Sequence, residues 1–129
     1  MTALGKTMLE IRIDEEPDHV VCRPHGELDA FTVSGFRETL AELASRPRVV
    51  IDLSGVSFMD SAGLGALIGG IRRIRENGGE VAVACNRPTL IRLLRTTGFD
   101  RIVAVVDTVA EALAALDAPT ASEQASDPG

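Results

Sequence analysis

The sequence predicts a single α/β domain in which helices cover a mixed, mostly parallel sheet of about five strands. Short apolar segments alternate with segments whose apolar residues recur every three or four positions, in the order β-β-α-β-α-β-α-β-α. The chain has 129 residues, of which 45% are hydrophobic, and this suits one domain with a core of ordinary size. Because the chain contains no Trp or Tyr and only four Phe, we expect an aliphatic core.

The first elements are two strands, expected at 8–13 and 19–25. A turn at 14–18 joins them, and this connection is short enough for antiparallel pairing. A helix follows, with Asp29 as its expected N-cap, and it continues to about Ser45. Its buried stripe is predicted to consist of Val33, Phe36, Leu40 and Leu43.

The rest of the chain alternates strand and helix. Strands are expected at 48–53, 80–84 and 102–105, and helices at 61–76, 88–96 and 107–116, the last with Asp107 as its cap. Asn77-Gly78-Gly79 and Gly98 are suited to ending the first two of these helices. We expect residues 1–7 to be a flexible N-terminus, 8–116 to form the domain, and the small, polar segment 117–129 to be a disordered tail.

The most informative segment is 49–65, which runs from a buried-type strand through a tight loop to Ser61. The apolar spacing of the following helix makes Asp60 or Ser61 its N-cap. Unpaired amides and the positive end of the helix dipole would then surround the Ser61 hydroxyl, so the fold would tolerate a phosphate there. The simpler interpretation is that the serine only caps the helix.

Four glycines lie within this helix, at positions 63, 65, 69 and 70. Each lowers the stability of the helix by up to about 1 kcal/mol relative to alanine, which indicates that the helix needs them for another purpose. Either the helix packs very closely against the sheet, or its first turns present a flat surface to another protein. The sequence leaves both alternatives open.

Several functional classes are disfavoured by composition. The formal charge of −6 argues against a nucleic-acid partner, and the arginines around 72–75 are interpreted as a solvated helix face. Cys22 and Cys85 lie far apart and are expected to be buried thiols in a reducing cytosol. His19, Cys22 and His25 fall on one predicted strand, where residues three apart face opposite sides, so no metal site and no cofactor are expected.

We also expect no targeting or membrane-spanning segment in this sequence. The first residues contain no apolar core of signal-peptide length, and the stretch 61–71 is too short to cross a bilayer. We therefore expect a cytoplasmic protein without membrane insertion.

Three segments carry a family resemblance. Gly26-Glu27-Leu28-Asp29, the strand-loop-helix segment ending in Asp-Ser-Ala-Gly-Leu-Gly at 60–65, and Arg-Pro-Thr-Leu-Ile-Arg-Leu-Leu-Arg-Thr-Thr-Gly-Phe-Asp at 87–100 resemble the STAS domain of bacterial anti-sigma factor antagonists. The resemblance covers about 8–116. It implies a protein that is not an enzyme, whose serine at position 61 is phosphorylated by an anti-sigma factor that is also a serine kinase. The unphosphorylated form binds that kinase and frees the sigma factor, and a serine phosphatase resets the switch.

The resemblance also implies a partner-binding surface around Ser61. Many relatives carry Ser or Thr where this chain has Ala62, so Ser61 is the only hydroxyl in the element. Asp60 either orients Ser61 or only caps the helix, and Asp29 either borders the surface or only caps its own helix. We expect Phe58 to be buried, and Met59 and Leu64 to lie nearer the partner. The predicted contact set is Asp29, Met59, Asp60, Ser61, Ala62, Gly63 and Leu64.

Two other functions remain open. The chain could be an accessory STAS subunit of a lipid transporter or a signalling assembly, with an unmodified Ser61 in a permanent interface. It could instead be a small enzyme or nucleotide binder, but Gly63-Leu64-Gly65 lacks the Gly-Lys-Ser/Thr of a P-loop. No nucleophile with a nearby base can be assembled from His19 and His25.

Overall fold

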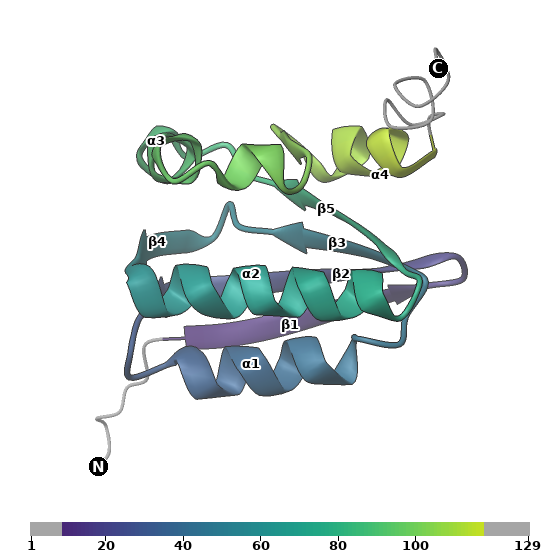
Figure 1. The fold of residues 1–129 in the computed structure, drawn as a ribbon, viewed down its shortest axis with the longest axis horizontal. Helices are drawn as coiled ribbons and strands as arrows, with labels where there is room; N and C mark the ends of the chain where they lie inside the picture. The colour runs from purple at the N-terminus through teal and green to yellow at the C-terminus, as the bar shows by residue number, and fades with distance from the viewer. Residues whose placement is uncertain (1–8, 118–129) are drawn as a thin grey trace.

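The computed structural model describes residues 9–117, which form one α/β domain (Figure 1). The strands are β1 (Leu9–Glu16), β2 (His19–Leu28), β3 (Arg48–Asp52), β4 (Val56–Met59), β5 (Glu80–Ala84) and β6 (Val105–Val106). The helices are α1 (Val33–Glu42), α2 (Ser61–Glu76), α3 (Pro88–Thr96) and α4 (Val109–Asp117), with a short 3₁₀ helix at Phe99–Arg101. The predicted flexible N-terminus and all but the first residue of the predicted tail lie outside the described residues.

The six strands form one mixed sheet. Its order is β1-β2-β3-β5-β6, and β4 pairs with β2 beside β3. Only the β1–β2 pair is antiparallel, and the other pairs are parallel. The predicted mostly parallel α/β domain is therefore confirmed, with one strand more than the five expected.

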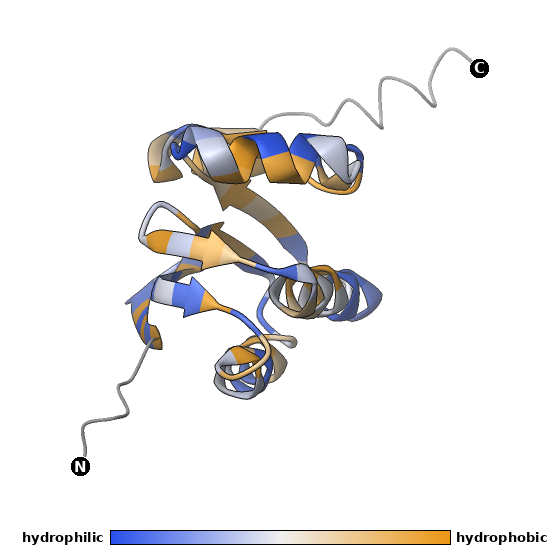
Figure 2. Cartoon of the chain, turned by 90° about the vertical axis from the view of Figure 1, so that its left-hand side faces the viewer, coloured by the Kyte–Doolittle hydropathy of each residue, from blue (hydrophilic) through white to orange (hydrophobic). Residues whose placement is uncertain are grey.

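Helices cover both faces of this sheet. Along the central strand β3, successive side chains therefore pack against helices on opposite faces. Val49 and Ile51 of β3 belong to the larger apolar cluster, which includes residues of α1 and α2. Val50 between them joins a smaller cluster with Ala112 of α4. The helices accordingly carry hydrophobic and hydrophilic residues together, as expected for helices with one buried face (Figure 2).

Strand β4 is the element that sequence analysis missed, because 56–59 was predicted as part of a loop. The pairing with β2 shifts there: Gly26 lies opposite Val56, but Glu27 lies opposite Phe58, so Ser57 is an extra residue in β4. Such a bulge breaks the alternation of faces along a strand. Its consequence is that Val56 and Met59, three positions apart, are both buried.

Other element boundaries differ from those predicted. Strand β1 ends at Glu16 and β2 begins at His19, so the turn between them has two residues rather than the five predicted. The final strand was predicted at 102–105 but forms at 105–106, because the amides of Ile102 and Val103 donate to the Phe99 carbonyl oxygen and close the turn that follows the 3₁₀ helix. Thr108 rather than Asp107 caps α4, since its Oγ1 accepts a hydrogen bond from the Glu111 amide at 3.1 Å.

Several predictions are confirmed. Helices α2 and α3 and strand β5 have the predicted bounds. Cys22 and Cys85 are buried free thiols, and burial raises the pKa of Cys22 to about 12.

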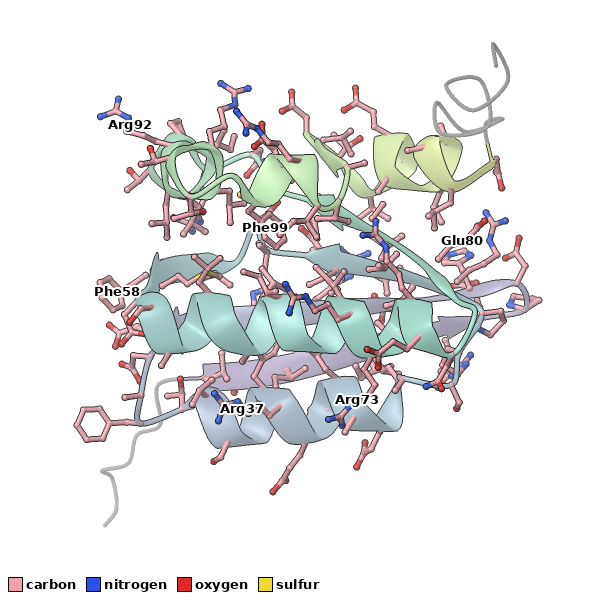
Figure 3. The ribbon with its side chains drawn as sticks, viewed as in Figure 1. Arg37, Phe58, Arg73, Glu80, Arg92 and Phe99 are labelled. Atoms are coloured by element: carbon pink, nitrogen blue, oxygen red, sulfur yellow. The ribbon has the colours of Figure 1, made fainter. Side chains whose placement is uncertain are left out.

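The glycines of α2 divide into two that allow close packing and two that do not. A Cβ on Gly63 would lie 2.4 Å from the Leu28 carbonyl oxygen, and one on Gly70 would lie 2.4 Å from Leu40 of α1, so these two allow close packing. Gly65 and Gly69 have open space where a Cβ would lie. They contribute to a groove of about 350 Å³ between α1 and α2, beside which Arg37 and Arg73 project (Figure 3).

Candidate functional site

The candidate site forms where the carboxyl ends of β2 and β4 meet. These strands are parallel, and their last residues, Leu28 and Met59, lie opposite each other. The next residues, Asp29 and Asp60, therefore leave the sheet at the same edge. The Asp60 amide donates to the Leu28 carbonyl oxygen at 3.2 Å, which fixes the start of α2 against the end of β2.

Asp60 is the N-cap of α2 and holds two segments together. Its Oδ1 accepts from the Gly63 amide at 3.0 Å, and its main-chain oxygen accepts from the Leu64 amide at 3.0 Å. Its Oδ2 accepts from the Ala30 amide at 3.3 Å. Of the two capping residues that the sequence allowed, Asp60 is thus the one used.

Ser61 is the first residue of α2 and is exposed. Its side chain and its amide form no hydrogen bond with any other residue of the 9–117 segment, and neither does the Ala62 amide. The hydroxyl therefore lies at a helix N-terminus where two backbone donors remain available to an anion. Ala62 and Leu64 are half-buried beside it, and Gly63 is buried under the first turn.

Asp29 does not cap α1 as predicted. Its Oδ1 accepts from the amides of Phe31 at 2.9 Å and Thr32 at 3.1 Å, which closes a tight turn before the helix. Thr32 occupies the N-cap position, and its hydroxyl donates to the Glu27 carbonyl oxygen at 2.7 Å. The half-buried Asp29 is nevertheless brought next to Asp60, because Ala30 links the two segments.

The expectation for Phe58 and Met59 is wrong. Phe58 is 49% exposed, whereas Met59 is 6% exposed and packs in the larger apolar cluster. The bulge at Ser57 explains the exchange, since strict alternation after a loop would have placed the two side chains the other way round. Phe58 projects beside the first turn of α2 (Figure 3).

Phe31 is a residue of this edge that sequence analysis missed. Its side chain is 94% exposed in the turn between β2 and α1. A signal was present in the sequence, because Phe31 lies outside the three-and-four spacing of Val33, Phe36 and Leu40. An aromatic residue outside the buried stripe, directly after a turn-forming Asp, is a candidate for contact with another molecule.

The acidic groups of the site are not neutralised by cations of their own domain. Within residues 9–117, neither Asp29 nor Asp60 forms an ion pair, whereas Arg23 bridges Asp14 and Asp52 at 2.7 and 2.6 Å. The hydrogen bond from Arg23 holds the pKa of Asp14 below its usual value.

The described segment contains no group of three His, Cys, Asp or Glu side chains placed to hold a metal ion.

Among the described helices, none combines the length and the apolar character that a bilayer crossing requires.

Comparisons with known proteins agree on one family. Residues 10–112 match the model of the STAS domain. The chain is 33% identical over 112 residues to an anti-sigma F factor antagonist of Paenibacillus polymyxa, covering 84% of this chain and 96% of the relative. It is 32% identical over 99 residues to an anti-sigma-B factor antagonist of Listeria monocytogenes, covering 75% and 86% of the two chains. The crystal structure of an anti-sigma factor antagonist from Mycobacterium paratuberculosis superposes with a TM-score of 0.79 at 26% identity, over 85% of this chain and 95% of that one.

Proposed function

Because the chain belongs to the STAS domain family of anti-sigma factor antagonists, we propose that it binds an anti-sigma factor with serine kinase activity and thereby releases a sigma factor. Phosphorylation of Ser61 by the bound kinase ends the complex, and a serine phosphatase restores it. The family is not enzymatic, so the protein acts by binding. In this proposal it works in the bacterial cytoplasm, where sigma factors meet RNA polymerase.

The observation that carries the proposal is the position of Ser61. Its hydroxyl is exposed at the start of α2, beside two backbone amides without a partner in the described chain. A kinase can reach it without unfolding the domain, and a phosphate there would accept hydrogen bonds from the helix terminus. The modification would therefore change the surface and leave the fold in place.

The charge of the surrounding surface explains how one phosphate could reverse binding. A phosphoserine adds about −1.5 to −2 charge units next to Asp60, which already accepts from Gly63 and Ala30 with its two carboxylate oxygens. Burying that phosphate in an interface without matching cations carries a desolvation penalty, and about 2.8 kcal/mol suffices to weaken binding a hundredfold.

Phosphate transfer tests the proposal directly. The purified chain is incubated with ATP and each anti-sigma factor kinase encoded in the same genome, and the modified residue is located by mass spectrometry. We expect a single phosphate on Ser61 that is absent from Ser61→Ala. Ser57→Ala is the matched control, because Ser57 is the exposed serine of the neighbouring strand β4 and should leave phosphate incorporation unchanged.

Binding titrations complete the test. Ser61→Ala should bind the kinase persistently, and Ser61→Glu or the phosphorylated chain should bind it about a hundredfold more weakly. Equal affinities for all of these forms would exclude the switch. Such a result, together with co-purification in a stable assembly, would favour the alternative of an accessory STAS subunit with a permanent interface.

A further inference from the structure

The four phenylalanines of the chain divide into two groups. Phe36 and Phe99 are fully buried, whereas Phe31 and Phe58 are 94% and 49% exposed and are the exposed large hydrophobic residues of the described segment. Both exposed rings lie at the same edge of the sheet as Ser61: Phe58 precedes it by three residues, and Phe31 follows the end of β2, the strand paired with β4. Single exposed apolar residues are common, but two aromatic rings at one edge indicate a contact surface.

The turn that carries Phe31 is held rigidly although its ring is in solvent. The Phe31 amide donates to Asp29 Oδ1 at 2.9 Å, and the next amide, that of Thr32, donates to the same oxygen at 3.1 Å. The Thr32 hydroxyl anchors this turn to the Glu27 carbonyl oxygen at 2.7 Å. Because these hydrogen bonds hold the backbone of the free chain, burial of the ring costs side-chain entropy but little backbone entropy.

Asp60 connects this turn to the phosphorylation site. The carboxylate that caps α2 through Gly63 also accepts from the Ala30 amide, one residue before Phe31. The turn at 29–32 therefore adjoins the start of α2, within reach of a protein that covers the Ser61 hydroxyl.

We infer that Phe31 is the principal anchor for the anti-sigma factor, inserting its ring into an apolar pocket of that protein, and that Phe58 makes the second apolar contact. The inference rests on the proposed function, because the partner is the one that approaches Ser61. It assigns affinity and partner specificity to the aromatic residues, while Ser61 supplies the switch. Phe is among the residues enriched in protein interfaces, and a few well-buried anchor residues carry most of the binding energy of an interface.

The test measures the affinity of the unphosphorylated full chain for the anti-sigma factor kinase by calorimetry. Phe31→Ala should weaken binding by about 10- to 100-fold and Phe58→Ala by less. Arg92→Ala, an exposed position on α3, is the control and should remain within about twofold. Because the Phe31 ring makes so little contact within its own domain, thermal unfolding of Phe31→Ala should match that of the wild type.

A second measurement shows whether the ring is buried. The chain contains no Trp, so Phe31→Trp grown with 5-fluorotryptophan gives one ¹⁹F resonance from this protein. Its chemical shift should depend on the H₂O/D₂O ratio in the free chain and lose that dependence in complex with the unlabelled kinase. A resonance that stays solvent-sensitive in the complex would overturn the assignment of Phe31 as the anchor.

The outcomes separate this inference from the proposed function. An unchanged affinity for Phe31→Ala with an intact effect of Ser61 phosphorylation overturns the anchor alone. A large effect of Phe31→Ala with no effect of phosphorylation overturns the switch alone. If the wild type binds no anti-sigma factor kinase of its genome, both are overturned.

Discussion

Both ends of helix α2 have backbone groups without a partner inside the helix, and the two ends differ in what surrounds these groups. At its C-terminal end the chain closes onto its own domain: the Asn77 side chain donates to the Ala44 carbonyl oxygen at 3.0 Å, and Gly79 packs against Arg46. At its N-terminal end Asp60 pairs two amides of the helix, while the amides of Ser61 and Ala62 are left without a partner in the described chain. The C-terminal end thus packs against its own domain, whereas the N-terminal end keeps two amides that can donate hydrogen bonds to a partner or a phosphate.

This difference indicates where a substitution should affect folding and where it should affect binding. Donors and acceptors satisfied within the domain contribute to the free energy of unfolding when they are removed. Exposed groups that the domain leaves unsatisfied contribute little to its own stability and are available to a partner or a phosphate. Substitutions at matched positions of the two ends can therefore test the comparison.

The largest effect is expected for Gly63→Ala, at the base of the N-terminal end. The added Cβ would lie 2.4 Å from the Leu28 carbonyl oxygen and 2.9 Å from the Leu28 Cβ, so α2 must move away from β2. We expect a loss of about 3 kcal/mol in the free energy of unfolding, measured with urea, together with weaker partner binding. Gly65→Ala, which meets no heavy atom within 4 Å, should instead stabilise the helix by up to about 1 kcal/mol. Equal stabilities for the two variants would contradict close packing at Gly63.

Gly79→Ala applies the same test to the C-terminal end. Its Cβ would lie 2.6 Å from the Arg46 carbonyl oxygen and 2.8 Å from the Ile74 side chain, so we expect a loss of about 2 kcal/mol. Because Gly79 lies beyond the other end of the 16-residue helix that begins at Ser61, the affinity for the anti-sigma factor should stay unchanged. Gly69→Ala, with open space at its Cβ, is the control for urea unfolding. A variant that loses affinity in proportion to stability would show that the two ends are not independent.

The sequence predicted α2 well because every signal at its ends agreed. The apolar spacing, Asp60 before it and Asn77-Gly78 after it all gave the bounds found in the structure. The position of the candidate serine could be predicted for the same reason, since a local pattern determines the start of a helix.

The surface around that serine could not be predicted as well, because it depends on contacts between distant segments. The bulge at Ser57 arises only when β4 pairs with β2, and it exchanges the exposure expected for Phe58 and Met59. The hydrogen bond between Asp60 and Ala30 likewise joins residues thirty positions apart. The closeness of the 29–32 turn to the start of α2 therefore does not follow from local spacing.

A smaller effect is expected from removing the polar side chain at each end. Asp60→Ala loses the helix cap and the hydrogen bond to Ala30, and we expect it to reduce stability by about 1 kcal/mol and to weaken partner binding as the 29–32 turn is released. Asn77→Ala loses one hydrogen bond to Ala44 and should reduce stability by about 1 kcal/mol without changing the affinity. Similar losses of stability with different losses of affinity, from urea unfolding and calorimetry, would confirm that the ends differ in function. Similar losses of affinity would contradict it.

The smallest effect is expected at a charge cluster that belongs to neither end. The hydrogen bond from Arg23 lowers the pKa of Asp14 in the folded chain, so the ionised carboxylate contributes stability above its unfolded pKa. That contribution is lost as the pH falls through the lowered folded value. Asp14→Asn should therefore be slightly less stable at pH 7 and should lose less stability on acidification to about pH 3, while its affinity for the anti-sigma factor at pH 7 stays the same. Glu10→Gln, on the same strand and without an ion pair in the described segment, is the control. An Asp14→Asn variant with the acid sensitivity of the wild type would show that the pair with Arg23 contributes nothing to stability.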